Sequence, residues 1–279
     1  MSDGPLAIVA GAGSLPWEAA AAIAPRREVV VFAIDGEADA APSAGPRIET
    51  HRLGYGQLGR ARRLAMERRC RDVLMLGAIR SRPDFASLVP DMDTLRLLPR
   101  IVRAAVGGDD TIVRNVIALF EDEGFRVVSV AEAAPELLAP SGLLGAHRPS
   151  AAQQADIDLG AAYLTASAPF DVGQAVVVVE GRVIAVEGAE GTDAMLARCA
   201  ELRRARRFRS EKGAGALVKR AKSGQDMRSD VPVVGLGTLR GALAAGLGGI
   251  AVESGRTILA ERAALRTEAD RARAFLVAL

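Results

Sequence analysis

Residues 6–18 read LAIVAGAGSLPWE and carry the clearest indication of the fold. An apolar run of five residues ends in Gly11-Ala12-Gly13, and an Ala-rich helical stretch follows. Ser14 is placed to cap that helix, and Pro16 falls in its first turn. A buried strand, a glycine turn and a helix are the opening unit of a Rossmann-like sheet. The sequence therefore predicts an α/β fold.

The first half of the chain continues this alternation. Apolar runs bounded by Gly and Asp predict strands, and amphipathic stretches predict helices. The predicted strands are 28–34, 72–79 and 125–130, and the predicted helices are 58–70, 93–105 and 111–123. Alternating strands and helices favour an open, mainly parallel sheet. Residues 1–134 are therefore expected to form a Rossmann-like, parallel-sheet domain.

The pattern changes after a Pro- and Gly-containing segment at 135–150, which we interpret as a linker. Residues 151–279 are expected to form a distinct carboxyl-terminal α/β domain. Strands at 174–180 and 182–187 around Gly181 predict a hairpin. The other predicted strands are 215–219, 231–234 and 249–252, and the predicted helices are 156–167, 192–207, 238–245 and an amphipathic 261–278.

Composition excludes several kinds of chemistry. A net charge of +2 argues against a broad nucleic-acid-binding field. Two Cys and two His cannot build a disulfide framework, a Cys-rich zinc or iron–sulfur site, or a His-rich two-metal centre. A metal here would be oxygen-bound, hence Mg²⁺ or a relative. The sequence has no run of 18 apolar residues and no basic signal-peptide start, so we expect a cytoplasmic location.

The basic residues are unevenly distributed. Of the 36, 33 are Arg, and the three Lys are Lys212, Lys219 and Lys222, all in one short segment. A general preference for Arg codons explains the shortage of Lys but not this clustering. Lysine supplies a compact charge that arginine does not reproduce.

The glycine turn is the first candidate ligand site. Glycines let a ligand approach the backbone, and a helix N-terminus favours a phosphate. The string is G-x-G-x-x-P, however, and close packing of the helix alone would also require it. Gly77 lies near the carboxyl end of the strand predicted at 72–79.

The stronger candidate site lies in the second half. Glu190, Thr192 and Asp193 open a helix and either cap it or present oxygen ligands. Further along, Asp226, Arg228 and Asp230 alternate, so an extended segment would place all three on one face, as a site or as a surface row of ion pairs.

This set of residues fits metal-assisted attack on a phosphate. Carboxylates hold Mg²⁺ and the metal activates water. Lys219, Lys222 and arginine neutralise a diphosphate. Thr192 or Gln174 would position the water or a sugar hydroxyl.

Several blocks resemble one family, the LpxI family, over essentially the whole chain. The long blocks are DVGQAVVV at 171–178, AVEGAEGTDAM at 185–195, LVKRAKSGQDMRSDVP at 217–232 and AGLGGIA at 245–251. Shorter matches are GAGSLP at 11–16, TLRLLP at 94–99 and GDD at 108–110.

The resemblance implies a UDP-2,3-diacylglucosamine pyrophosphatase of lipid A synthesis. Such an enzyme uses Mg²⁺ and directs water at the sugar-side phosphorus. The products are UMP and 2,3-diacylglucosamine 1-phosphate (lipid X). The resemblance implies a Rossmann-like domain and a carboxyl-terminal α/β domain with substrate between them, and a homodimer. The Arg-rich helical stretches 58–70 and 202–209 would either touch the anionic surface of the inner membrane or form solvated faces.

The resemblance also assigns roles to residues of this chain. The implied catalytic residues are Asp226, Lys219 and Asp193. The implied metal ligands are Asp226, Glu190 and Asp230. The implied substrate-binding residues are Gly11, Ala12, Gly13, Gly77, Ala78, Gln174, Glu190, Thr192, Asp193 and Lys222.

Two other classes of function stay open at this point. A nucleotide-sugar transferase or epimerase would retain a nucleotide without hydrolysing it. A non-catalytic lipid- or nucleotide-sugar-binding module would bind the substrate without turnover, and binding would survive Asp226→Ala.

Overall fold

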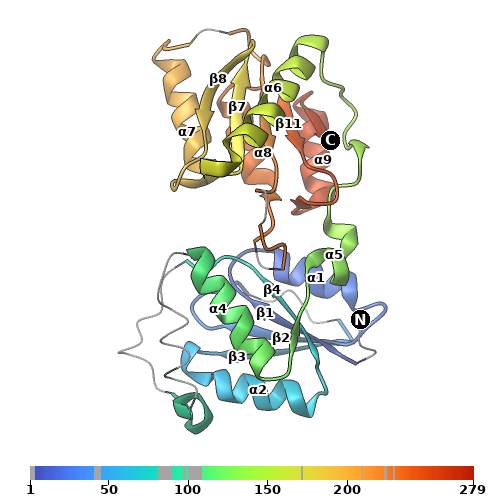
Figure 1. Cartoon of the computed structure of the whole chain (residues 1–279). Coiled ribbons are helices and arrows are strands. Elements are labelled where there is room, and N and C mark those ends of the chain that lie inside the picture. Colours follow the sequence, from blue (N-terminus) through green and yellow to red (C-terminus); the bar gives the residue numbers. More distant parts are fainter. Residues whose placement is uncertain are drawn as a thin grey trace. The chain divides into compact units, whose positions relative to one another are not determined.

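The computed structural model of the chain describes residues 4–40, 45–80, 90–96, 99, 109–170, 172–208, 210–222, 225–228 and 230–279. The chain divides into two units, Met1–Ala134 and Pro135–Leu279, and each unit has its own main sheet (Figure 1).

The amino-terminal unit is built on a five-stranded parallel sheet of order β3-β2-β1-β4-β5. Helix α1 covers one face of the sheet, and helices α2 and α4 cover the other (Figure 1). The strand order reverses direction at β1, as it does in Rossmann-like sheets. The predicted Rossmann-like architecture is therefore confirmed. The strands are β1 (Leu6–Ala10), β2 (Val29–Ile34), β3 (Ile48–Leu53), β4 (Asp72–Leu76) and β5 (Arg126–Val127), and the helices are α1 (Leu15–Ile23), α2 (Leu58–Glu67) and α4 (Asp109–Asp122).

Some element boundaries in this unit differ from the predictions. The strand predicted at 125–130 stops at Val127, because Ser129 and Glu132 form a capping box that starts the short helix α5 (Val130–Ala133). The helix predicted at 58–70 ends at Glu67, shortly before Arg69 takes a φ of +57°. Strand β3 was not predicted. Most of the helix predicted at 93–105 lies outside the described residues, although 92–96 are helical.

The carboxyl-terminal unit has a six-stranded mixed sheet of order β6-β13-β11-β9-β7-β8. Strands β9, β11 and β13 are parallel, and β7 and β8 form the predicted antiparallel hairpin. The main-sheet strands are β6 (Gly142–Leu143), β7 (Ala175–Val179), β8 (Arg182–Val186), β9 (Ala216–Lys219), β11 (Gly249–Val252) and β13 (Phe275–Ala278); a separate pair is β10 (Val233–Val234) with β12 (Ile258–Leu259).

Both faces of this sheet are buried under helices. Helix α6 (Ala151–Ser167) packs on the face that carries Val176 and Val178. Helices α7 (Gly191–Arg204), α8 (Leu236–Ala244) and α9 (Arg262–Arg271) pack on the face that carries Val177 and Val179. The continuous apolar run of β7 follows from this double burial.

Two predictions in this unit need correction. The predicted helix 261–278 is wrong at its end, because α9 stops at Arg271 and the last residues form β13 between β6 and β11. An apolar run of four residues is too short for its periodicity to distinguish strand from helix. Segment 135–150 is also structured, with a 3₁₀ turn at Pro135–Leu137 and with β6 paired antiparallel to β13.

The strand directions determine where loops gather. Strands β8, β9 and β11 run the same way, so their carboxyl ends lie at one edge of the sheet. The start of β7 lies there as well, since Ala175 is the register partner of Lys219 at the end of β9. Most of the site residues predicted in the second half lie at or near this edge.

Candidate functional site

A chain of three polar side chains is buried at this edge of the carboxyl-terminal sheet. Glu187 follows β8, Thr192 lies in the first turn of α7, and Lys219 ends β9. The exposed fractions of these residues are 7%, 8% and 6%. The Thr192 hydroxyl donates to Glu187 Oε1 at 2.6 Å, and Lys219 Nζ donates to Thr192 Oγ1 at 2.8 Å. A lysine this deeply buried needs such partners.

The electrostatics of Lys219 follow from this placement. Burial lowers the pKa of its ammonium below the usual value, because the charged form loses its hydration. The negative charges of Glu187, Asp193 and Asp230 oppose that shift. The structure therefore brings predicted residues Lys219, Thr192, Asp193 and Asp230 into one electrostatic group, with Glu187 as an addition to the predicted set.

Gln225 connects the loop after β9 to the rest of the site. Its side-chain oxygen accepts from Lys222 N at 2.7 Å, and its amide nitrogen donates to Asp230 Oδ2. The same nitrogen lies 3.4 Å from Gln174 Oε1, at the start of β7. Predicted residues Gln174, Lys222 and Asp230 are therefore joined through a glutamine that was not predicted as a site residue.

The expected extended row at 226–230 is wrong. Residues 227–228 form a turn, and Asp230 N donates to the carbonyl of Asp226 at 3.1 Å. Asp226 Oδ1 also accepts from Arg228 N at 3.0 Å. An aspartate that bonds the backbone two residues ahead stabilises a turn in competition with an extended strand. Asp226 and Asp230 are consequently brought together by a turn and not by alternation along a strand.

The Asp226 carboxylate is paired with Arg228. The guanidinium contacts both carboxylate oxygens, with Nη2 to Oδ2 at 2.7 Å and Nε to Oδ1 at 3.0 Å. The side chains are 28% and 36% exposed, so the pair is accessible to solvent and to a ligand. Any cation that binds Asp226 must compete with this guanidinium.

Glu190 occupies a different environment. It is the N-cap residue of α7 but makes no side-chain capping bond, and its carboxylate accepts from Arg198 Nη2 at 2.8 Å. That hydrogen bond lowers the pKa of Glu190. Within the described ranges, no group of three His, Cys, Asp or Glu side chains is arranged to hold a metal ion. Asp226, Glu190 and Asp230 therefore form no preassembled three-carboxylate cage.

The donors present still suit Mg²⁺ chemically. Asp226 and Asp230 offer hard carboxylate oxygens from one turn of a single loop, and the Asp230 carboxylate lies beside the Gln225 amide, which also contacts Gln174 Oε1. Protein Mg²⁺ is commonly held by one or two carboxylates, with phosphate oxygens of the substrate and water completing the octahedron. The residues fit a site of that type.

The amino-terminal candidate residues form a backbone zipper at the carboxyl ends of β1 and β4. Ala12 and Ala78 exchange two backbone hydrogen bonds, of 2.8 and 3.1 Å. A Cβ at Gly11 would lie 2.5 Å from the Ala78 carbonyl oxygen, and one at Gly77 would lie 2.6 Å from the Gly11 carbonyl carbon. The close approach of two chain segments thus accounts for both glycines.

Gly13 is placed differently. Its backbone N–H donates to Asp39 Oδ2 at 2.7 Å, and Arg80 Nη2 donates to Asp39 Oδ1 at 2.9 Å. These contacts lower the pKa of Asp39. Ser14 precedes α1 as predicted, but its hydroxyl bonds to Glu18 and makes no cap to the backbone.

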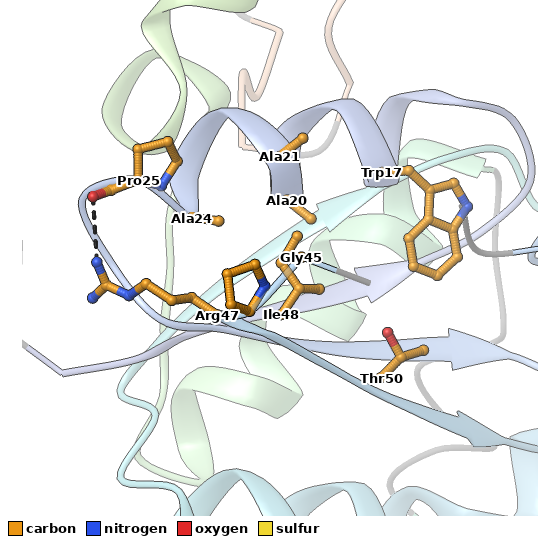
Figure 2. A pocket seen from close by; sticks show the side chains of 10 residues that line it. Trp17, Ala20, Ala21, Ala24, Pro25, Gly45, Arg47, Ile48 and Thr50 are labelled. Atoms are coloured by element: carbon orange, nitrogen blue, oxygen red, sulfur yellow. Dashed lines mark hydrogen bonds between the residues drawn. The ribbon is translucent and has the colours of Figure 1, made fainter. Parts of the chain in front are cut away.

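An apolar pocket of about 390 Å³ lies between α1 and β3 in this unit (Figure 2). Trp17, Ala20 and Ala21 of α1 and Ala24 just after it line one side, and Ile48 and Thr50 line the other. None of the predicted site residues lines this pocket.

Sequence reasoning missed Glu187 and Gln225. Glu187 follows an apolar strand, and Gln225 is one polar residue among many in its loop. Neither a glutamate after a strand nor a glutamine in a polar loop is unusual, so no local feature marks these two residues as part of a site. The one feature that could have found them is that each lies inside a block that resembles a known family.

Comparison with known proteins covers both units. The family model described as the LpxI N-terminal domain matches residues 5–137, and the one described as the LpxI C-terminal domain matches 140–277. The chain is also similar to a protein of Caulobacter vibrioides named UDP-2,3-diacylglucosamine pyrophosphatase LpxI. The two are 38% identical over 266 residues, which are 95% of this chain and 94% of that protein.

Proposed function

Because this chain belongs to the LpxI family, we propose that it is a hydrolase that cleaves the diphosphate bond of UDP-2,3-diacylglucosamine. The observation that carries the proposal is 38% identity over nearly the full length of both proteins, to a relative named for this activity. We further propose that the reaction depends on Mg²⁺, that water attacks the sugar-side phosphorus, and that UMP and 2,3-diacylglucosamine 1-phosphate (lipid X) are released.

The buried lysine supports chemistry at a diphosphate. The Lys219 ammonium is held by Thr192 in a desolvated position, where a fixed charge acts more strongly than it would in water. Negative charge develops on the phosphate oxygens as water adds, and a preorganised cation stabilises it. We assign Lys219 that role and assign Lys222 to ground-state binding of the diphosphate.

The acidic residues are assigned different roles. Asp226 and Asp230 would hold Mg²⁺, which when bound lowers the pKa of water and offsets charge on the phosphate oxygens. Asp226 is also the residue that we propose takes a proton from the attacking water. Asp193, exposed in the first turn of α7, and Gln174 are assigned to orienting substrate hydroxyls. Glu190 stays a proposed ligand that would first have to leave Arg198.

The amino-terminal unit has a smaller part in the proposal. Ala12 and Ala78 bond to each other through their backbones, and Gly11 N donates to the Leu76 carbonyl at 2.8 Å. Gly11, Ala12, Gly77 and Ala78 are therefore proposed to contact the substrate through backbone groups that these bonds leave accessible. Gly13, on the same loop, is the other proposed contact.

Contacts with the membrane and with a second copy of the chain are also part of the proposal. The substrate is a lipid, so we propose peripheral contact with the cytoplasmic side of the inner membrane, and a homodimer. None of the described helices is long and apolar enough to cross a membrane. Three arginines of the α2 region pair with acids (Arg62 with Glu123, Arg63 with Asp93, Arg68 with Glu49), which reduces the positive field that α2 offers to anionic lipids.

The deciding experiment is product analysis with the purified full chain. UDP-2,3-diacylglucosamine is incubated with Mg²⁺ or with a chelator, and products are resolved by phosphorus NMR. We expect UMP and the lipid monophosphate only when metal is present. In ¹⁸O-water the label should appear in the lipid monophosphate, and label in UMP would overturn the proposed direction of attack. Intact bound substrate without turnover would instead indicate a binding module.

A further inference from the structure

Glu187 is a buried carboxylate with no part in the proposed chemistry. Both of its oxygens are engaged: Oε1 accepts from the Thr192 hydroxyl at 2.6 Å, and Oε2 accepts from Gln174 N at 2.8 Å. Its backbone is held as well, since Gly173 N donates to the Glu187 carbonyl and Glu187 N donates to the Ala175 carbonyl, each at 2.9 Å. A carboxylate buried at this depth and fixed at four points is a rigid part of the site.

The hydrogen bonds have a defined direction. An ionised carboxylate only accepts, so the Thr192 hydroxyl must give its single proton to Glu187. The Thr192 oxygen is then left with its lone pairs facing Lys219, which donates to it. Glu187 thereby determines the orientation of the hydroxyl, and the hydroxyl determines the direction of one N–H of the ammonium. A lysine ammonium has three donors, so two can be directed elsewhere.

Local packing makes this arrangement specific. A Cβ at Gly173 would lie 2.5 Å from Glu187 Cβ, so only glycine allows the chain entering β7 to pass over this glutamate. The same entry segment carries Gln174, whose carbonyl accepts from Arg220 N at 2.9 Å, directly after Lys219. The ends of β8 and β9 and the start of β7 are thus fixed relative to one another around the three side chains.

We infer that Glu187 is the positioning residue for Lys219, acting through the Thr192 hydroxyl to aim the ammonium at the phosphate oxygens of a diphosphate. Only the identity of the ligand rests on the proposed function. The Glu187–Thr192–Lys219 chain is a geometric unit, and its effect on the lysine can be measured without turnover.

The test uses the full chain and the fact that it contains only three lysines. Lysine labelled with ¹³C at Cε and ¹⁵N at Nζ gives three side-chain signals, and the Lys219 signal is assigned by its loss in Lys219→Arg. We expect Glu187→Gln and Thr192→Val to move the Lys219 signal and leave the Lys212 signal in place. Thr192→Ser, which keeps the hydroxyl, should preserve the parent spectrum. Glu201→Gln, on the exposed side of α7, is the matched control and should change nothing.

Kinetics supply the second readout. With UDP-2,3-diacylglucosamine and Mg²⁺, we expect Glu187→Gln and Thr192→Val each to lower kcat at least about ten-fold with KM changed less than kcat, because a displaced group loses alignment in the transition state. The double variant should be no worse than either single variant, as for residues that act as a unit. Thr192→Ser should restore most of kcat.

The two experiments distinguish failure of the inference about Glu187 from failure of the proposed function. An unmoved Lys219 signal in Glu187→Gln, with or without a loss of kcat, overturns the inference. Additive losses in a folded double variant would overturn it as well. If the parent chain shows no hydrolysis, the proposed function fails, yet the lysine spectra still decide whether Glu187 positions Lys219.

Discussion

Asp226 and Arg228 are two residues apart and form a two-point ion pair, with Arg228 Nη2 2.7 Å from Asp226 Oδ2 and Arg228 Nε 3.0 Å from Oδ1. The guanidinium therefore covers the oxygens that a metal ion would take. Removing it with Arg228→Ala should lower the Mg²⁺ concentration for half-maximal activity. An exposed pair is worth up to about 1 kcal/mol, so we expect a decrease of about two- to five-fold. The measurement is a Mg²⁺ titration of initial rate.

The control for this prediction is Arg271→Ala, which removes a similar pair with Glu268 on the surface of α9. That variant should keep the parent Mg²⁺ dependence. A rise in the Mg²⁺ requirement of Arg228→Ala would show that Arg228 helps to assemble the metal site and does not compete with the metal.

Lys219→Met tests the role assigned to the buried ammonium. Methionine has similar length and no charge, so it keeps much of the packing while removing the stabilisation of developing phosphate charge. We expect kcat to fall by about two orders of magnitude or more, the scale seen when a preorganised donor is lost. Circular dichroism checks that the variant is folded. A folded Lys219→Met that keeps parent kcat would remove Lys219 from the mechanism.

The elements predicted correctly are those that are determined by residues close together in the sequence. Strands 6–10 and 249–252 have the predicted boundaries, because each is an apolar run ended by glycine or a polar residue. The hairpin at Gly181 also follows from local rules, since Glu180 and Gly181 both take positive φ in the turn, +51° and +73°. Elements stabilised by distant partners were harder to predict. The edge strand β3 is rich in polar residues, and β13 is a strand because β6 and β11 flank it.

The difference between local and distant determinants also explains which parts of the site were predicted from the sequence. The chain segments were identified, but the contacts within them depend on which backbone turns form. Asp226 bonds the backbone of Arg228 and makes a turn where alternation predicted an extended row. Glu187 enters the site because the ends of β8 and β9 and the start of α7 meet in the fold, and no spacing in the sequence shows this.

Gly11→Ala tests whether close packing of two chain segments requires glycine at the amino-terminal turn. The added Cβ would lie 2.5 Å from the backbone oxygen of Ala78, which cannot move without breaking the Ala12–Ala78 bridge. We expect the free energy of unfolding to fall by about 2 kcal/mol or more in urea denaturation. Gly54→Ala is the control, because Gly54 has a φ of −73° and open space around its Cβ position, and it should be near neutral. Unchanged stability in Gly11→Ala would contradict the packing explanation.

The two cysteines should be protected by the fold. Cys70 and Cys199 are free and buried, and burial raises the pKa of both thiols, that of Cys70 to about 11. The thiolate is the reactive form, so both factors suppress reaction at neutral pH. A colorimetric disulfide reagent should detect almost no thiol in the native chain and two per chain in denaturant. Rapid reaction of one thiol under native conditions would show that its unit opens locally.

Tyr55 should make stability fall at high pH. Its hydroxyl donates to Glu37 at 3.3 Å, and burial together with the Glu37 charge raises the pKa of Tyr55 to about 12. Between pH 10 and 12 the unfolded chain loses this proton while the folded chain keeps it. The folded state then binds more protons, so the free energy of unfolding decreases as pH rises through this window.

Tyr55→Phe has no such proton and should lose less stability than the parent between pH 9.5 and 11.5 in matched urea titrations. In a Tyr163→Phe background, where Tyr55 is the one remaining tyrosine, ultraviolet absorbance should place its ionisation near pH 12. A midpoint near 10 would show that the Glu37 contact does not hold the phenol in its neutral form.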